Sequence, residues 1–378
     1  MSNQTKNLVN SLTLLTLVAS LTSCGGGTET AQTGTTEGGS TPTATANKPE
    51  FASNVSLNGA GASFPAPLYQ AWFVQLNQEI PNLQVNYQST GSGAGVEQFT
   101  QGTIDFGASD VAIKPKEAAK VKSGVLALPM TAGSIVIGYN LPGVDKLQLS
   151  QEAYTGIFAG TITKWNDPKI VKDNPDAKLP DLPITVVHRS DGSGTTAVFT
   201  KHLATISPEW KKDFGEGKSI EWPTKKGKFL GAKGNEGVTA TLQQNQGSVG
   251  YVEYGYAKNN KVTFAALQNK AGKFVEATDA SAAAALASEP LPSDLILFIS
   301  NPPGDDAYPI VTYTWMLVNK KYDDPNKAKG IEAMIQFGLT TGQKQSSALG
   351  YVPLPPEVVK KVAAAADVIS PDFQIKVD

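Results

Sequence analysis

The pattern that decides the fold is clearest in residues 184–203, ITVVHRSDGSGTTAVFTKHL. This stretch begins with the apolar run Ile184–Val187, which predicts a buried strand. A loop of charged, glycine and hydroxyl residues follows, and then Val198 and Leu203 begin a run with helical spacing. Strand, glycine-rich loop and helix in this order predict parallel α/β construction.

The same order recurs along the rest of the chain. Apolar runs and alternation predict strands at 55–57, 83–87, 103–106, 134–139, 248–252 and 308–317. Helical spacing predicts helices at 68–80, 96–99, 149–158, 238–244, 328–337 and 357–365.

Length and composition narrow the possible functions. The 378 residues suit two domains, and the net charge of −2, from 32 basic and 34 acidic side chains, argues against a nucleic-acid partner. One Cys and two His exclude Cys₄, Cys₂His₂ and His₃ metal sites within the chain, and also two-cysteine redox motifs. We therefore expect no metal and no cofactor, and we expect the chemistry to rest on Ser, Thr, Asp, Arg and backbone amides.

The N-terminal residues predict export and a membrane tether. The apolar run 8–21 is too short to span a bilayer and is typical of a secretory signal. It ends in Leu21-Thr-Ser-Cys24, which resembles the bacterial lipobox, so we expect a lipoprotein signal peptide over 1–23 and lipidation of Cys24. An ordinary signal peptide with a chance cysteine is the alternative. Residues 24–50 are rich in Gly and Thr and lack large apolar side chains, which predicts a disordered tether.

Three loops share glycine with a hydroxyl residue at a predicted helix start, at 61–64, 91–93 and 191–195. A helix N-terminus has free N–H groups and a partial positive charge, glycine permits close approach, and a hydroxyl adds a donor. Ordinary helix capping explains any one loop. Three such loops, one of them beside Arg189, favour an oxyanion ligand.

Asp110 ends the stretch Gly107-Ala-Ser-Asp110, which follows the strand predicted at 103–106 and precedes the segment 111–114. By itself it is explained as a helix cap. In an anion site, a carboxylate accepts a hydrogen bond from a protonated phosphate oxygen and repels an anion that has no proton to give. Arg189 would supply charge to the ligand and to Asp110 together.

Motifs for other functions are missing from the sequence. No G-x-x-x-x-G-K-[ST] run and no G-x-S-x-G occur, and the spacing at 91–95 does not match G-x-G-x-x-G. We expect His202 to be packed or solvated on its helix, and His188 to be structural at the end of its strand.

Taken in order, these motifs resemble the phosphate-binding proteins of bacterial high-affinity phosphate ABC transporters, the PstS family. The stretches that carry the resemblance are GAGASFPAPLYQAW (59–72), NYQSTGSGAGVEQF (86–99), DFGASD (105–110), VVHRSDGSGTTAVF (186–199), GAKGNEGV (231–238) and GSVGYVEYGYAK (247–258). They are spread over most of the chain after residue 55, whereas residues 260–306 match poorly.

The resemblance implies an α/β fold of the two-lobed periplasmic-binding-protein type II, with a hinge between the lobes. Lobe I would comprise 51–138 and 310–378, and lobe II would comprise 139–309. The residues implied to bind phosphate are Ser63, Phe64, Ser92, Asp110, Arg189, Ser193, Gly194 and Thr195. Phe64 would contribute its backbone N–H, and Asp191 would support Arg189.

The implied function is capture of inorganic phosphate outside the cytoplasm and its delivery to the membrane permease and ATPase subunits of an ABC transporter. We expect a non-enzymatic, periplasmic monomer held at the cell membrane by a lipid anchor. Two alternatives stay open: a binding protein for another oxyanion such as sulfate or molybdate, and a secreted serine-type phosphatase or esterase that uses Ser63 or Ser193.

Overall fold

The computed structural model describes residues 48–377. The predicted signal peptide 1–23, Cys24 and the predicted tether up to residue 47 lie outside these residues. Among the residues that are described, no helix is both long enough and apolar enough to cross a membrane.

Most strands belong to one nine-stranded sheet of order β2-β1-β3-β12-β4-β8-β6-β7, with β9 paired to β4. These strands are β1 Val55–Gly61, β2 Leu83–Ser89, β3 Phe106–Ser109, β4 Val125–Tyr139, β6 Thr185–Arg189, β7 Lys228–Ala232, β8 Ser248–Glu253, β9 Thr263–Phe264 and β12 Val311–Asn319. A small second sheet contains β5 Gln148–Leu149, β10 Ala266–Gln268 and β11 Phe274–Val275.

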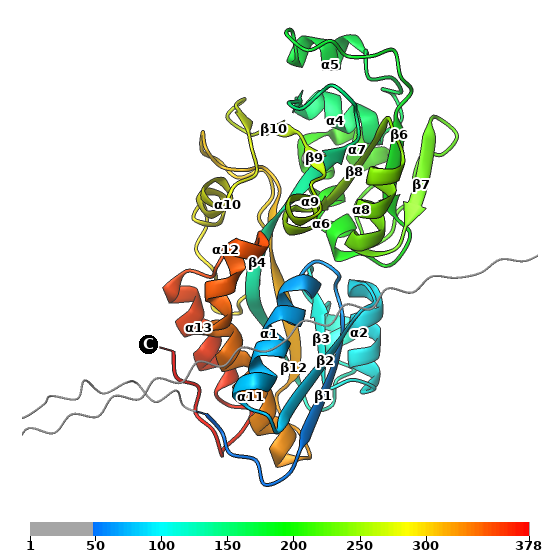
Figure 1. The fold of residues 1–378 in the computed structure, drawn as a ribbon. Helices are drawn as coiled ribbons and strands as arrows, with labels where there is room; N and C mark the ends of the chain where they lie inside the picture. The colour runs from blue at the N-terminus through cyan, green and yellow to red at the C-terminus, as the bar shows by residue number, and fades with distance from the viewer. Residues whose placement is uncertain (1–47, 378) are drawn as a thin grey trace, which may run out of the picture. The chain divides into compact units, whose positions relative to one another are not determined.

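Helices follow most of the strands (Figure 1). They are α1 Ala66–Glu79, α2 Ser92–Gln101, α3 Pro115–Ala118, α4 Gln151–Phe158, α5 Pro168–Asp173, α6 Gly194–Ile206, α7 Pro208–Asp213, α8 Gly234–Gln244, α9 Tyr254–Asn259, α10 Asp279–Leu286, α11 Pro325–Leu339, α12 Ser346–Leu349 and α13 Pro356–Ala366, with a 3₁₀ turn at Gly342–Gln345.

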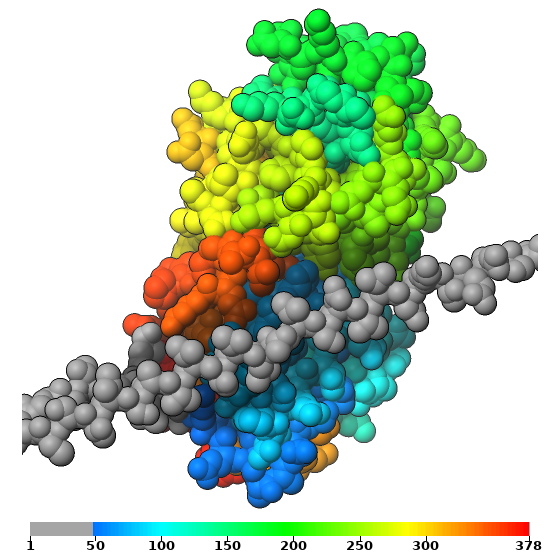
Figure 2. Space-filling model, in the orientation of Figure 1, coloured from blue at the N-terminus to red at the C-terminus, as the bar shows by residue number. Residues whose placement is uncertain are grey.

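One lobe is built on β1, β2 and β3, which pair in parallel, with α1 and α2 as their connections. Pro65 and Pro67 flank the first turn of α1, where a fixed φ favours helix initiation. Leu68, Trp72 and Leu76 then recur every four residues and are all buried. The C-terminal helices α11 and α13 lie beside this lobe (Figure 1), and the orange and red C-terminal residues adjoin its blue N-terminal part in Figure 2.

The other lobe is built on β8, β6 and β7, which also pair in parallel. The long strand β4 connects the two lobes. Its first part pairs with β12, and its last part, Ile135–Tyr139, pairs with β8. The chain therefore has the two-lobed α/β fold that the sequence predicts.

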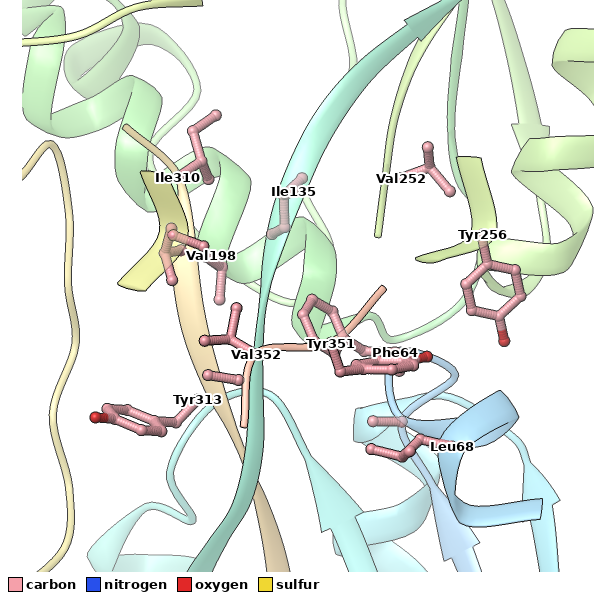
Figure 3. Close-up of a cluster of buried hydrophobic side chains, with 14 of the residues drawn as sticks. Phe64, Leu68, Ile135, Val198, Val252, Tyr256, Ile310, Tyr313, Tyr351 and Val352 are labelled. Carbon is pink, nitrogen blue, oxygen red and sulfur yellow. The ribbon is translucent and has the colours of Figure 1, made fainter. Parts of the chain in front are cut away.

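Buried apolar side chains are continuous across the junction of the lobes (Figure 3). Phe64 comes from the loop before α1 and Leu68 from the first turn of α1. Ile135 comes from β4 and Val252 from β8, and Tyr351 lies among them from the C-terminal part of the chain. The loop before α1 is therefore anchored in the same core as the strands that cross between the lobes.

Two details of the sequence prediction were wrong. The strand predicted at 103–106 runs over Phe106–Ser109. Asp105 lies directly before this strand, and its N–H donates to the Asn58 carbonyl of β1 at 2.7 Å. Its carboxylate accepts from the Asn58 N–H at 2.8 Å and from Lys327 Nζ at 2.7 Å. The sheet is also mixed and not purely parallel, because β12 returns antiparallel between β3 and β4.

Candidate anion-binding site

Four strand ends position the predicted site residues. Because β1, β2 and β3 are parallel neighbours, their carboxyl ends meet at one edge of the sheet. Ser63 follows β1, Ser92 begins α2 after β2, and Asp110 directly follows β3. Arg189 is the last residue of β6 in the other lobe, and the loop after it leads into α6.

The loops of the two lobes are in direct contact. The Gly93 N–H donates to the Gly192 carbonyl at 2.7 Å. Asn235, near the start of α8, donates from its backbone N and its Nδ2 to Ser63 Oγ at 3.0 and 2.9 Å. The Asn235 amide also donates to Thr195 Oγ1 at 3.2 Å. A hydroxyl has two lone pairs and one hydrogen, so Ser63 still has its hydrogen to donate to a ligand.

Asp110 is 1% exposed and lies where the two lobes meet. Its Oδ1 accepts from the Thr314 hydroxyl at 2.9 Å, and its Oδ2 lies 3.5 Å from both Ser92 Oγ and Thr195 Oγ1. Burial raises the pKa of Asp110 to about 6, while the Thr314 hydrogen bond and the positive charge of Arg189 oppose that rise. The carboxylate is therefore mostly ionised at pH 7 and available as an acceptor.

Arg189 is the only arginine among the 32 basic side chains, and it is 5% exposed. Its Nε and Nη2 donate to the two carboxylate oxygens of Asp191 at 2.7 and 2.5 Å. Burial alone would lower the pKa of Arg189, but the Asp191 contacts raise it above its usual value. Burial likewise would raise the pKa of Asp191, but the pairing with Arg189 holds it below its usual value. Both groups are therefore charged, and this two-bond geometry fixes the plane of the guanidinium.

The N-terminus of α6 lies against Asp110. Ser193 caps the helix by accepting from the Thr196 N–H at 3.0 Å. The first amides of a helix have no partner within it and lie at its positive end. Gly194 is required here, since a Cβ at this position would lie 2.6 Å from Asp110 Oδ2 and 2.4 Å from Ser92 Oγ.

Two tyrosines bind the backbone carbonyls of the loop between β1 and α1. Tyr256 donates to the Ser63 carbonyl at 2.8 Å, and Tyr351 donates to the Phe64 carbonyl at 2.7 Å. The Phe64 ring is fully buried and packs edge-on against Tyr351, with centroids 6.3 Å apart. This ring therefore belongs to the core, and only the backbone of Phe64 is suited to bind a ligand.

The structure thus brings together Ser63, Ser92, Asp110, Arg189, Ser193, Gly194 and Thr195, with Asp191 on Arg189. Sequence reasoning did not single out Asn235 or Thr314. Asn235 lies within the stretch 231–238 that carries the family resemblance, so its position was a usable signal. Thr314 had no such signal, because only the pairing of β12 with β3 places its hydroxyl on Asp110.

Both histidines have partners away from the site serines. His202 is buried with its Nε2 2.7 Å from the Tyr154 hydroxyl, and burial lowers its pKa to about 3. His188 has its Nδ1 2.9 Å from the Arg189 carbonyl, and it stacks on Trp222. Neither contact arranges a base for a serine nucleophile. Between residues 48 and 377, no group of three or more His, Cys, Asp or Glu side chains is placed to hold a metal ion.

Comparison with known proteins agrees with this geometry. A family model described as a PBP superfamily domain matches residues 28–340. The phosphate-binding protein PstS of Xylella fastidiosa (strain 9a5c) is 39% identical over 93% of this chain and 96% of its own length. That of Pasteurella multocida is 43% identical over 82% of this chain and 89% of its own length.

A solved structure shares the fold. It is a putative phosphate ABC transporter substrate-binding protein from Clostridium perfringens with bound phosphate, with a TM-score of 0.59 and 18% identity over 80% of this chain and all of that one. At that identity the likeness concerns the fold alone. The two curated relatives carry the assignment: the chain belongs to the PstS family of phosphate-binding proteins.

Proposed function

We propose that this protein captures inorganic phosphate outside the cytoplasm and delivers it to the permease of a phosphate ABC transporter. One observation carries the proposal. The buried carboxylate of Asp110 in one lobe faces the N-terminus of α6 from the other lobe, with Arg189 near both. The names of the curated relatives and the phosphate bound in the structural neighbour support the same ligand.

Each group has a role that suits a singly or doubly protonated phosphate. Arg189 and the first amides of α6 would donate to unprotonated oxygens, because charge-assisted bonds to an oxyanion are the strongest available. The hydroxyls of Ser63, Ser92, Ser193 and Thr195 and the Phe64 N–H would add donors. Asp110 would accept the phosphate proton, which penalises an anion that has none.

Binding is proposed to close the lobes around the anion. We assign 51–138 and 310–378 to lobe I and 139–309 to lobe II, with the hinge where β4 and β12 run between them. The change of β4 from pairing with β12 to pairing with β8 at Ile135, four residues before the proposed boundary at 139, supports a crossing in this part of β4. Closure by hinge motion is a usual response of two-lobed binding proteins to their ligand.

The N-terminal sequence supports a proposal for the cellular location of the protein. We propose that residues 1–23 direct export, that Cys24 carries the lipid anchor, and that the tether lets a monomeric body reach the permease. Lys6, the apolar run 8–21 and the lipobox-like Leu21–Cys24 support this.

The protein is proposed to bind without chemistry. Its family is one of substrate-binding transport proteins and not of enzymes. His202 contacts Tyr154 and His188 contacts the Arg189 carbonyl, so neither is engaged with the serine that a phosphatase or esterase would need to activate.

Calorimetry on protein freed of ligand by unfolding and refolding tests the proposal. Phosphate should bind with micromolar affinity or better, about −8 kcal/mol, whereas sulfate, which has no proton at neutral pH, should bind far more weakly. The absence of heat with phosphate would contradict the proposal. Tighter binding of sulfate or molybdate than of phosphate would assign the site to another oxyanion.

A further inference from the structure

We propose that Thr314 sets the selectivity of the anion site, because its hydroxyl occupies one carboxylate oxygen of Asp110 and leaves the other for the ligand. This inference rests on the proposed phosphate-binding function and adds a positioning residue to it. Thr314 acts through Asp110 and does not itself touch the anion.

The contact is a cross-strand pair. Asp110 directly follows β3, which pairs antiparallel with β12. Trp315 lies opposite Ser109, so one further step in the same register places Thr314 opposite Asp110. Thr314 Oγ1 lies 2.9 Å from Asp110 Oδ1, and both side chains are buried. The position of the hydroxyl is therefore fixed by the sheet and not by a mobile loop.

An irregularity in the sheet coincides with Thr314. On its other side, β12 pairs with β4, and there Thr314 lies opposite Thr131 whereas Trp315 lies opposite Pro129. Met130 is the extra residue of this bulge. Proline cannot donate to a ladder and occurs in central strands mainly at bulges. Since bulges change the direction of side chains beside functional sites, Pro129 provides a sequence-level cause for the local geometry at Thr314.

The two oxygens of Asp110 have different surroundings. Oδ1 has the short bond from Thr314, whereas Oδ2 has only Ser92 Oγ and Thr195 Oγ1 at 3.5 Å, the outer limit of hydrogen bonding. The less satisfied Oδ2 also lies nearest the N-terminus of α6, where an anion would bind. It is therefore the oxygen that can accept a ligand proton.

Without the Thr314 hydroxyl, Oδ1 would be a buried charged acceptor with no donor, and protonation of Asp110 would be the least costly remedy. Burial already raises the pKa of Asp110 to about 6, and the Thr314 bond is the largest influence that lowers it, ahead of the charges of Arg189 and Lys218. The buried Glu253 is a further acidic group close enough to interact with Asp110. A protonated Asp110 would donate to the ligand, and the site would then accept an anion that has no proton.

The test compares Thr314→Val, which keeps the shape and removes the donor, with Thr314→Ser, which keeps the donor. Phosphate and sulfate affinities are measured by calorimetry at pH 7 on ligand-free protein. The ratio of phosphate to sulfate affinity should fall about tenfold or more in Thr314→Val, as expected for a lost bond to a charged acceptor. Thr314→Ser should stay within about threefold of the wild type, because its hydroxyl can restore the bond.

Thr312→Val is the matched control. Thr312 is buried on the same strand, but its hydroxyl donates to the Tyr313 carbonyl at 2.8 Å and not to Asp110. The ratio of phosphate to sulfate affinity in Thr312→Val should equal that of the wild type. Thermal unfolding monitors the fold of each variant, and Thr314→Ala replaces Thr314→Val if the latter does not fold.

The outcomes separate this inference from the proposed function. Wild-type protein that binds no phosphate overturns the proposed function. If the wild type prefers phosphate and folded Thr314→Val has the same ratio of phosphate to sulfate affinity, only the role of Thr314 is overturned. A uniform loss of both affinities also overturns it, since that result indicates a purely structural role.

Discussion

The two lobes bring opposite charges to the same site. The lobe built on β6 contributes Arg189 and the positive end of α6, which attract any oxyanion. The lobe built on β1–β3 contributes hydroxyls and the carboxylate of Asp110, which repels an anion without a proton. Under the proposed function, we expect the positive charge of one lobe to contribute mainly to affinity and the carboxylate of the other mainly to selectivity.

Arg189 and Asp110 also differ in their hydrogen-bond partners. Nε and Nη2 of Arg189 are paired with Asp191 within the same lobe, while Nη1 lies 3.4 Å from Thr195 Oγ1, and both charged groups stay ionised. Asp110 has one short bond to its carboxylate, from Thr314, and its pKa is raised to about 6 by burial. We therefore expect the carboxylate of Asp110 to respond to pH and to the protonation of the ligand, whereas the Arg189–Asp191 pair stays charged.

Removing the positive charge of Arg189 should have the largest effect on anion affinity. Arg189→Ala is expected to weaken phosphate and sulfate alike, by about 100-fold or more, because bonds to charged groups contribute roughly 1.5–3 kcal/mol each and Asp191 is left unpaired. Calorimetry measures both affinities. Lys211→Ala, which removes an exposed cation from α7, should leave them unchanged. Similar losses in the two variants would mean that net charge, and not Arg189, attracts the anion.

Removing the charge of Asp110 should change the affinity for phosphate relative to that for sulfate. Asp110→Asn is expected to weaken phosphate about tenfold, while sulfate binding holds or improves, because the amide can donate where the carboxylate could only accept. Competition between the two anions measures the ratio. Glu97→Gln, an exposed change on α2, serves as the control. An unchanged preference for phosphate in Asp110→Asn would remove the carboxylate from the account.

The pH dependence of phosphate binding should include a contribution from Asp110 in addition to the protonation of phosphate itself. The pKa of Asp110 is raised from 3.8 to about 6, so the group gains a proton as the pH falls through 6 and can then no longer accept one from phosphate. Phosphate affinity should therefore be about tenfold lower at pH 5 than above pH 7. Titrations between pH 5 and 8 test this, and Asp110→Asn should lack this decrease. A decrease of the same size in that variant would place its origin elsewhere.

Removing the Asn235 side chain, which joins the two lobes by hydrogen bonds, should have the smallest effect on anion affinity. Asn235→Ala removes the two Nδ2 donations to Ser63 and Thr195 and the acceptor of the Glu253 N–H. These bonds lie within the protein and affect the anion only through the positions of the two hydroxyls, so phosphate and sulfate should weaken equally, by about fivefold, or about 1 kcal/mol. Asn245→Ala, at the other end of α8, is the control. A change in the ratio of the two affinities would show that Asn235 selects between anions and does not simply join the lobes.

Much of this arrangement was predictable from the sequence, for physical reasons. The alternation of strand, glycine loop and helix gave the α/β class, because periodicity and glycine are local properties. The three loops of glycine and hydroxyl residues indicated an oxyanion site, and the family resemblance implied Ser63, Ser92 and Thr195 within them. Arg189 was a candidate as a cation next to such a loop.

What was missed depends on contacts between distant segments. Thr314 approaches Asp110 only through the pairing of β12 with β3, and Asn235 reaches Ser63 only because the lobes meet. Neither follows from spacing along the chain. The prediction placed the strand at 106–109 three residues too early because Ile104 suggests a strand, whereas the contacts of Asp105 with Asn58 and Lys327 come directly before the strand begins.

A crystal structure of the phosphate-bound protein tests the central claim most directly. The account predicts one phosphate between the lobes, with an oxygen within hydrogen-bond distance of Asp110 Oδ2 and others on Arg189 and the first amides of α6. Phosphate bound elsewhere, or bound between the lobes without contact to Asp110, would contradict the division of attraction and selection between the two lobes.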